Sequence, residues 1–297
     1  MIEYSIIIPT YKRKESLLRL LESLRSEIKP EYEVIVVEQR IHNGEAYLAF
    51  AKKHHIALNY IFLDTPSTPH AKNIGAKKAK GKYLIFFDDD VILHKGCLKG
   101  YEEAFLKKHR DIIAGRVITP GQAINENSLR VGKISYWGDF SDEFSSLIPQ
   151  EVDTVIGCNA GWRKSVFDEV GGFDEQITMN GIREESDLSL RAKQLGYQIF
   201  FEPSAVVTHV REETGGGRKS EGRLWWYYNF LSNETYFFLK YRPAWVVVII
   251  LLRRWEWILR CMFGFGREVS WRSMVTPFAG IWYGVKKYRR WKYENRH

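Results

Sequence analysis

Three consecutive carboxylates, Asp88, Asp89 and Asp90, interrupt an apolar stretch with the sequence YLIFFDDDVIL, residues 83–93. Like charges beside a buried strand are costly unless positive charge compensates them. The spacing of Asp88 and Asp90 suits a hard divalent cation such as Mg²⁺ or Mn²⁺, which takes oxygen ligands and keeps positions open for phosphate oxygens. A solvated turn or a helix N-cap is the alternative, because aspartate is also favoured at helix starts.

A second acidic pair, Glu184 and Glu185, occurs in the segment REESDLSLRAKQLGY. Leu188 and Leu195 follow helical spacing and Gly196 ends the predicted helix, which places the acidic pair in its first turn. A carboxylate held there can act as a general base. Acids in a first turn are also favoured by the helix dipole, so a capping role is the alternative.

The elements that must position these acids alternate along the first part of the chain. Short apolar runs predict strands, and helical patterns lie between them. Continuous apolar strands separated by helices predict a parallel sheet covered on both faces, with ligands bound beyond the carboxyl ends of the strands. The aspartates follow the fourth of these strands. The predicted strands are SIIIP at 5–9, EVIVV at 33–37, NYIFL at 59–63 and YLIFF at 83–87.

The charge of the chain is concentrated at its C-terminal end. Residues 223–297 contain 14 Lys and Arg against four Asp and Glu, and eight of the ten tryptophans. The chain as a whole has a net charge of +8, so residues 1–222 carry a net charge of −2. The Gly-rich segment EETGGGRKSEGR, residues 212–223, indicates a loop between the two parts. We therefore expect a domain at 1–222 and a helical extension at 223–297.

The extension is expected to lie on a membrane surface. Its longest apolar run, AWVVVIILL at 244–252, is too short to span a bilayer. Tryptophans mixed with arginines, from Trp255 to Arg272, are typical of interfacial helices, and the basic end KKYRRWKYENR suits anionic headgroups. Packed helices with a solvated basic face are the alternative. Nucleic acid is a further alternative, but the body contains no nucleic-acid module, so no nucleic-acid partner is expected.

The cysteines and the first residues bear on the compartment. Cys97, Cys158 and Cys261 are odd in number and far apart, which favours reduced thiols in a cytoplasmic protein. The first residues enter a strand-like run without a basic leader, so no signal peptide is expected. The expected location is the cytoplasm, peripherally on the inner face of the cell membrane.

Four motifs together resemble a known family. SIIIPTYKR at 5–13, HAKNIGAKKAKGKYLIFFDDD at 70–90, GGFDE at 171–175 and REESDLSLRAKQLGY at 183–197 occur in this order. The ordered set is similar to family 2 glycosyltransferases of the GT-A fold. The resemblance implies an α/β fold in which a mostly parallel nucleotide-binding sheet, flanked by helices, is joined to an acceptor-binding half. It also implies inverting transfer of a sugar from a nucleotide diphosphate donor.

The resemblance implies roles at the donor site. Asp88 and Asp90 match the family's DxD motif, in which one aspartate faces the ribose or a water and the last reaches the metal. His209 stands where the family often has a metal ligand, and a structural role is its alternative. The metal would therefore be held by Asp90, Asp88 and His209. Residues implied to bind the nucleotide or donor are Pro9, Thr10, Tyr11, Glu38, Lys72, Asn73, Asp88 and Asp89.

Two of these donor assignments depart from the family pattern. Lys72 and Asn73 stand where the family often has Arg-Asn, so Lys72 would hold the diphosphate only as a point charge; a solvated helix position is the alternative. Glu38 stands where the family has an Asp that contacts the base, and the Gly-Ser turn that should follow is missing from VVEQRIHNGEA. The nucleotide base therefore stays open.

The resemblance also implies the catalytic pair and an acceptor loop. The family has an acidic pair whose second member is the general base, which maps to Glu185, with Glu184 beside it. The segment GCNAGWRK, residues 157–164, occupies the place of a loop that meets donor sugar and acceptor, with Asn159 and Trp162 as candidates. A core position is the alternative for Trp162.

The expected function is transfer of a sugar to a saccharide or lipid-linked acceptor in the synthesis of envelope polysaccharide or glycolipid, assisted by Mn²⁺ or Mg²⁺. One alternative is a protein of the same fold that binds a nucleotide-sugar without transferring it, which the altered VVEQ segment would permit. Another is a nucleotidyltransferase, but its Gly-rich phosphate loop is missing after SIIIPTYKR.

Overall fold

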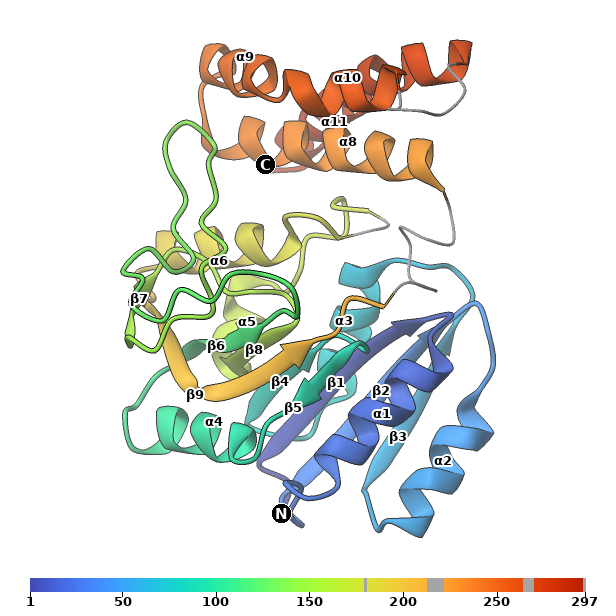
Figure 1. Ribbon diagram of the computed structural model, residues 1–297, viewed down its shortest axis with the longest axis vertical. Coiled ribbons are helices and arrows are strands. Elements are labelled where there is room, and N and C mark those ends of the chain that lie inside the picture. Colours follow the sequence, from blue (N-terminus) through green and yellow to red (C-terminus); the bar gives the residue numbers. More distant parts are fainter. Residues whose placement is uncertain (179–180, 213–221, 264–269, 296–297) are drawn as a thin grey trace.

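The fold was analysed in a computed structural model, which describes residues 1–178, 181–212, 222–263 and 270–295. One mixed sheet forms the centre of the molecule, with strand order β3-β2-β1-β4-β8-β6-β9-β5 and β7 paired to β9. Helices cover both faces of this sheet, and a group of C-terminal helices lies beyond the carboxyl ends of its first strands (Figure 1). The GT-A-like α/β architecture expected from the sequence is confirmed.

The first half of the sheet is parallel, as the sequence predicts. Its strands pair in parallel register, with Ile7 opposite Ile35 of β2 and Phe86 of β4. The apolar residues of β1, β2 and β4 are buried on both faces, which accounts for their continuous hydrophobic runs, whereas those of β3 at the edge are only partly buried. The elements are β1 Tyr4–Tyr11, α1 Lys14–Leu24, β2 Tyr32–Gln39, α2 Gly44–Lys53, β3 Leu58–Leu63, α3 Thr68–Lys78 and β4 Tyr83–Phe87.

The second half of the sheet is mixed. β8 runs antiparallel to both β4 and β6, β6 is parallel to β9, and β5 and β7 are antiparallel to β9. The elements are β5 Val91–Leu93, α4 Cys97–Leu106, β6 Ile112–Ile118, β7 Gln150–Val152, β8 Asn159–Arg163, α5 Lys164–Val170, α6 Glu184–Gln194 and β9 Ile199–His209.

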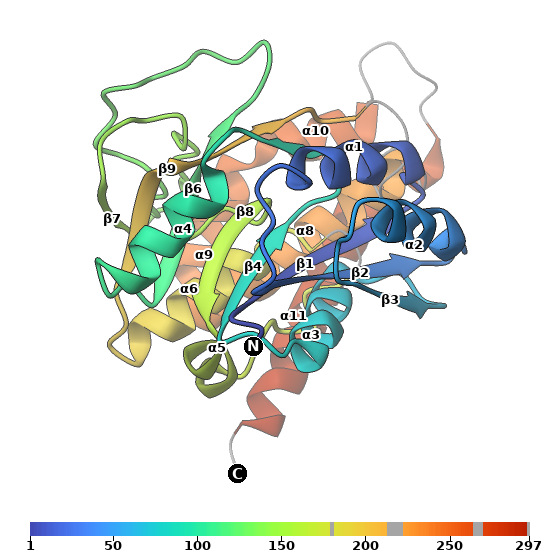
Figure 2. The ribbon, with the colours of Figure 1, turned by 90° about the horizontal axis from the view of Figure 1, so that it is seen from below.

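Helix α3 packs closely on the sheet. Figure 2 shows α1, α2 and α4 on one face of the sheet and α3 and α5 on the other. A Cβ atom added at Gly75 of α3 would lie 2.5 Å from the side chain of Ile7 in β1, so only glycine permits this approach. The close packing brings Lys72, one helical turn earlier, to the carboxyl end of β4.

The C-terminal helices lie beyond the carboxyl ends of β1 and β4 (Figure 1). They are α8 Arg223–Tyr241, α9 Ala244–Arg253, α10 Trp255–Phe263 and α11 Trp271–Glu294. In the described part of the chain, no helix combines the length and apolarity that a membrane crossing requires.

The C-terminal helices are joined to the body by buried ion pairs. Lys240 of α8 donates to Asp187 of α6 at 2.5 Å and to Asp174 at 2.8 Å. The division that we propose, into 1–222 and 223–297, falls at the Gly-rich segment; its residues 213–221 lie outside the described residues. Arg267 and the last basic residue, Arg296, which the membrane prediction included, also lie outside them.

Candidate active site

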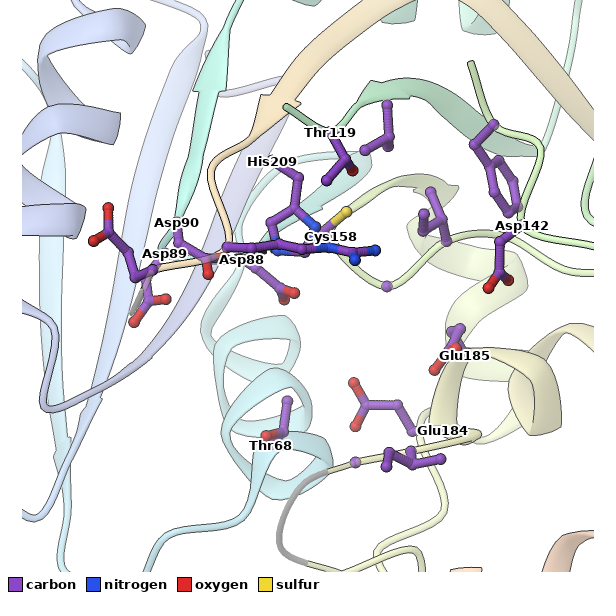
Figure 3. A pocket seen from close by; sticks show the side chains of 18 of the residues that line it. Thr68, Asp88, Asp89, Asp90, Thr119, Asp142, Cys158, Glu184, Glu185 and His209 are labelled. Carbon is purple, nitrogen blue, oxygen red and sulfur yellow. Dashed lines mark ion pairs between the residues drawn. The ribbon is translucent and has the colours of Figure 1, made fainter. Parts of the chain in front are cut away.

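A cavity of about 890 Å³ lies between the carboxyl edge of the sheet and the C-terminal helices. Figure 3 shows Asp88 and Glu184 pointing into it from opposite sides. Of the residues that the sequence singles out, it is lined by Pro9, Thr10, Tyr11, Lys72, Asp88, Asp89, Asp90, Glu184, Glu185 and His209. The two acidic motifs, almost one hundred residues apart in sequence, therefore face the same space.

Strand pairing brings His209 to the aspartates. β5 begins at Val91, which pairs with His209 at the end of β9, and the backbone N–H of Val210 donates to the carbonyl of Asp90 at 2.9 Å. One ligand atom each from Asp88, Asp90 and His209 lies within 4.8 Å of the others. The family resemblance groups these three residues as metal ligands, but the residue pattern alone does not reveal the pairing of β5 with β9, because β5 has only three residues.

This donor set fits a divalent cation. Two carboxylates and an imidazole are ligands that Mn²⁺ and Mg²⁺ sites use, with the imidazole favouring Mn²⁺. The side chain of Asp88 is 35% exposed, so it can move to meet an ion. The Nε2 atom of His209 lies 3.2 Å from the Oδ1 atom of Asp90. In the absence of a cation, burial lowers the pKa of His209, but hydrogen bonds to Asp90 and Cys158 outweigh it and raise this pKa to about 11, so a bound cation would have to replace the proton of this imidazole.

Arg13 supplies much of the positive charge that the three aspartates require. Its Nη1 atom donates to Asp89 at 3.0 Å and to Asp90 at 2.8 Å, and the hydroxyl of Thr10 donates to Asp89 at 2.7 Å. Asp89 is thus held towards β1, outside the cluster formed by Asp88, Asp90 and His209. Arg13 is the last residue of the SIIIPTYKR motif, but nothing in the sequence pattern indicates its pairing with the aspartates.

Lys72 is the second cation at the aspartates, and it is 1% exposed. Its Nζ atom lies 2.6 Å from Glu184, 3.2 Å from the carbonyl of Gly157 and 3.8 Å from Asp88. Burial lowers the pKa of Lys72, but the nearby carboxylates of Glu184 and Asp88 outweigh it and raise this pKa. A solvated helix position, the alternative for this residue, is therefore wrong. Lys72 connects the two acidic motifs through one buried charge.

The two glutamates of α6 lie in different surroundings. Glu184 is 3% exposed and paired with Lys72, while its Oε2 atom has no hydrogen-bond partner among the described residues. Glu185 is half-buried and borders the cavity. Burial raises the pKa of Glu185 above its usual value, and a raised pKa suits a carboxylate that accepts a proton near neutral pH.

The start of α6 is fixed by an arginine in an uncommon conformation. Arg183, its N-cap, has φ +77°, a left-handed value that non-glycine residues seldom adopt. Its guanidinium donates to the fully buried Glu234 of α8 at 2.5 Å and lies 3.4 Å from the ring centre of Phe140. The C-terminal helices therefore hold the turn that presents Glu184 and Glu185.

Two expected donor contacts are not found at the cavity. Glu38 is fully buried and accepts hydrogen bonds from Asn43, Tyr47 and Tyr60, so it cannot reach a nucleotide base in this conformation. Successive residues of a strand point to opposite faces, and Gln39, the next residue, borders the cavity instead. Strand alternation could have indicated this.

Asn73 is the second expected donor-binding residue that does not reach the cavity. Its side-chain amide donates to the carbonyl of Phe173 at 2.9 Å and accepts from the backbone N–H of the same residue at 2.8 Å. Asn73 is not among the residues that line the cavity. It fixes the GGFDE segment against α3 instead.

The expected acceptor residues Asn159 and Trp162 are also misplaced by the sequence analysis. Both are fully buried in strand β8, and neither lines the cavity. The amide of Asn159 bonds to Tyr101, to the carbonyl of Arg116 and to that of Ala205. The core alternative for Trp162 is therefore the correct one. The loop preceding β8 does reach the cavity, through Ile156, Gly157 and Cys158.

Aromatic residues of the C-terminal helices form a wall of the cavity that the sequence analysis missed. They are Trp225, Trp226 and Phe230 of α8 and Trp257 of α10. The abundance of tryptophan in the extension is visible in the sequence, where it favours a membrane surface, with packed helices or nucleic acid as the alternatives; none of these interpretations predicts a wall of the cavity. Arg211 and Asp142 also border the cavity without having been predicted.

Comparisons with known proteins agree with this geometry. The family model described as glycosyl transferase family 2 matches residues 5–171. Poly-beta-1,6-N-acetyl-D-glucosamine synthase of Staphylococcus epidermidis is 24% identical over 231 residues, which cover 74% of this chain and 53% of that protein. The chain spans about half, or less, of the length of such curated relatives.

Solved structures are similar in fold. S. aureus TarS 1-349, in complex with UDP-GlcNAc, has a TM-score of 0.65 at 17% identity, with 96% of this chain and 81% of that chain covered. The mannosyltransferase PcManGT of Pyrobaculum calidifontis, in complex with GDP-Man and Mn²⁺, has a TM-score of 0.58 at 12% identity, with 99% and 88% covered.

Proposed function

Because the chain belongs to glycosyl transferase family 2 and is therefore a glycosyltransferase, we propose that it transfers a sugar, with inversion, from a nucleotide diphosphate sugar. The acceptor is a hydroxyl of a saccharide or of a lipid-linked saccharide, in the synthesis of envelope polysaccharide or glycolipid. The observation that carries the proposal is the cavity in which the cluster of Asp88, Asp90 and His209 faces Glu185.

The donor binds at the carboxyl edge of the sheet in this proposal. Pro9, Thr10 and Tyr11 border the nucleotide, and Asp88, Asp90 and His209 hold Mn²⁺ or Mg²⁺. A divalent cation there would offset the negative charge of the departing diphosphate. Structural neighbours that contain UDP-GlcNAc, or GDP-Man with Mn²⁺, support this type of donor without fixing its base or sugar.

Glu185 is the general base in this proposal. Inversion requires one carboxylate to take the proton of the acceptor hydroxyl as its oxygen attacks the anomeric carbon from the side opposite the diphosphate. Glu185 borders the cavity and its pKa is raised by burial. Lys72 holds Glu184 at 2.6 Å, so this second carboxylate has a charged partner already.

The proposal places the enzyme on the inner face of a cell membrane. Cys97, Cys158 and Cys261 are buried free thiols, which are typical of a reducing compartment. The basic and tryptophan-rich extension supports an anionic membrane surface as a partner. A protein that only binds the nucleotide-sugar has no use for Glu185 at the cavity. Slow release of free sugar from the donor, which such a binder lacks, distinguishes the two.

Binding of nucleoside diphosphates tests the proposal. Titration of UDP and GDP by calorimetry should give tight binding of at least one of them with Mn²⁺ and much weaker binding with EDTA. Asp90→Asn should remove the difference between the two conditions. Glu22→Gln, at an exposed position of α1 that does not line the cavity, serves as a folded control. Equal affinity with and without EDTA in the unchanged protein would contradict a metal-assisted transferase.

A further inference from the structure

The two walls of the cavity differ in chemistry. One wall, at the sheet, carries the charged side chains of Asp88, Lys72 and His209. The other, which we call the aromatic wall, consists of Trp225, Trp226 and Phe230 of α8 and Trp257 of α10. The diphosphate and its cation match the charged wall, and Pro9, Thr10 and Tyr11, which border the nucleotide in the proposed function, lie at the sheet as well. The aromatic wall is therefore available to the other substrate.

The aromatic wall is preformed by ring stacking. Trp226 stacks on Phe230 with ring centres 5.0 Å apart and planes 12° apart, and Trp257 lies 5.7 Å from Trp226 and 5.3 Å from Phe230. Phe230 is buried, whereas the three indoles are only partly buried. Flat indole faces of this kind bind sugar rings and hydrocarbon chains.

Helix α10 joins the aromatic wall to an exposed apolar surface. Trp257 faces the cavity, while Trp255, Leu259 and Phe263, spaced by four residues along the same helix, are exposed. The exposed apolar positions continue on α9 with Trp245, Val248 and Leu252. We call these six residues the outer face. Figure 1 shows α9 and α10 at the end of the molecule farthest from the N-terminus.

Two arginines border the outer face, and each is paired with an acid, Arg253 with Asp139 and Arg260 with Glu256. Arg253 follows Leu252 in α9, and Arg260 follows Leu259 in α10. Both side chains are about half exposed. Tryptophan, leucine and arginine in this mixture match the interface of a bilayer that contains anionic lipid, where aromatic rings lie at the level of the headgroups. Helix α10 would then have one side at the bilayer surface and the other at the cavity. This arrangement suits a substrate that has an apolar chain at one end and a sugar at the other.

We infer that the acceptor is a lipid-linked saccharide, whose sugar lies against the aromatic wall near Glu185 and whose lipid chain leaves along α10 into an anionic bilayer. The inference rests on the proposed function and narrows its acceptor from two classes to one. A soluble saccharide would need the aromatic wall but not the outer face. A second copy of the chain would cover the outer face but leave the aromatic wall without a role.

Two simple glycosides test the inference, because they share a sugar and differ in the chain. Octyl β-D-glucoside, kept below its micelle concentration, and methyl β-D-glucoside are titrated by calorimetry into the full chain with Mn²⁺ and a nucleoside diphosphate. We expect the octyl compound to bind at least about tenfold more tightly, because its chain buries apolar surface that the methyl group lacks. Equal binding of the two glycosides would overturn the inference.

Substitutions locate the binding. Trp257→Ala should remove the advantage of the octyl chain and leave the affinity for the nucleoside diphosphate unchanged. Trp271→Ala removes a tryptophan that is 73% exposed and lies outside both the aromatic wall and the outer face, so it should keep that advantage. An equal loss in both variants would show adsorption to surface tryptophans and would overturn the inference. If the unchanged protein does not bind the nucleoside diphosphate at all, the result counts against the proposed function instead.

Discussion

At the scale of the residue, Glu184 and Glu185 are neighbours with different freedom. Consecutive side chains leave a helix about 100° apart, so the two carboxylates cannot take the same position. Glu184 is buried against Lys72 at 2.6 Å, whereas Glu185 borders the cavity and is only half-buried. An acceptor hydroxyl that enters the cavity therefore meets Glu185, which forms no ion pair with a lysine among the residues that the structure describes.

The first prediction concerns this pair. Glu185→Gln keeps the shape of the side chain but removes its basicity. It should lower kcat by roughly 10² to 10⁴, the usual contribution of general-base catalysis, and leave donor affinity nearly unchanged. Steady-state kinetics with an identified acceptor, beside calorimetry of the donor, provide the measurement.

Glu184→Gln is the matched comparison. It should retain more of kcat but lower the free energy of unfolding, because buried Lys72 loses its charged partner. If Glu184→Gln is inactive and Glu185→Gln is active, the base is Glu184. If both variants turn over normally, the pair only begins a helix.

The position of a site residue could be predicted where the residue belongs to a motif and the motif lies at the end of a predicted strand. Asp88 and Asp90 follow a buried strand, so their place at the cavity could be read from the sequence. Strand alternation separates Glu38 from Gln39, but the hydrogen bonds that hold Glu38 come from Tyr47 of α2 and Tyr60 of β3, and these partners depend on packing. Trp162 was misplaced because a tryptophan in a core strand and one in a loop look alike in sequence.

At the scale of the element, α6 depends on a contact from α8. Glu234 is fully buried and accepts from Arg183 at 2.5 Å, while Arg254 at the end of α9 lies 3.4 Å from its other oxygen. Arg254 also donates to the carbonyl of Gly138 at 2.6 Å. One carboxylate thus joins the first turn of α6 to the C-terminal helices.

The second prediction is made for this carboxylate. Glu234→Gln leaves two arginines without their buried counter-charge and should lower the free energy of unfolding by about 3 kcal/mol or more. Because Arg183 would lose its hold on the turn before Glu185, kcat should fall while donor affinity is retained. Urea denaturation and steady-state kinetics measure the two effects.

Glu256→Gln provides the control for that variant. Glu256 lies on α10 with a side chain 59% exposed, 3.7 Å from Arg260, and exposed pairs of this kind contribute little to stability. It should behave like the unchanged protein. A Glu234→Gln variant as stable and as active as Glu256→Gln would show that α6 does not need the carboxylate of Glu234.

Helix α11 carries a buried lysine with neutral partners. Lys287 donates to Asn233 at 2.8 Å and to Thr178 at 3.0 Å. Burial lowers its pKa from 10.5 to about 7, although Asp174 raises it slightly. The folded state therefore disfavours the charged form. The contribution of Lys287 to the free energy of unfolding is therefore most favourable above pH 10.5, where the lysine is neutral in both states, and it is lost as the pH falls towards 7.

The third prediction follows from the direction of this pH dependence. Between pH 7 and 9.5 the free energy of unfolding should rise with pH by up to about 1.4 kcal/mol per unit relative to Lys287→Met, in which this proton is absent. Urea denaturation at several pH values gives the two slopes. Lys286→Met, at an exposed position of the same helix, should keep the slope of the unchanged protein. Identical slopes in all three proteins would refute it.

Elements were predictable where each strand runs continuously apolar and a helix separates it from the next. β1 to β4 satisfy this rule, and the structure has them in parallel register. β8 joins the sheet antiparallel, beside β4, after about seventy intervening residues. Its five residues, NAGWR, carry no alternating or continuous apolar pattern, so only tertiary contacts define the strand.

At the scale of the whole molecule, charge and exposed aromatic residues are concentrated at one end. Residues 223–297 have a net charge of +10 and the rest of the chain −2. The alternative of purely packed helices accounts for α8, whose residues from Asn229 to Phe238 are buried. It does not account for the outer face on α9 and α10, where Trp245, Leu252 and Trp255 are each more than half exposed.

The last prediction concerns binding of the full chain to membranes, since deleting the extension would also remove the ion pairs that hold α6. Phosphatidylcholine vesicles containing phosphatidylglycerol should carry the protein upward in a flotation gradient at low salt. Added salt should weaken the binding, because headgroup attraction is screened within about 8 Å at physiological ionic strength. Replacing Trp255 and Leu259 together by Glu should abolish flotation, whereas Leu106→Glu, at an exposed position on α4 far from the extension, should not.

If the unchanged protein stays below the vesicles at low salt, the outer face serves another contact. A dimer of the unchanged chain in light scattering, absent from the double variant, would then identify a second copy as that contact.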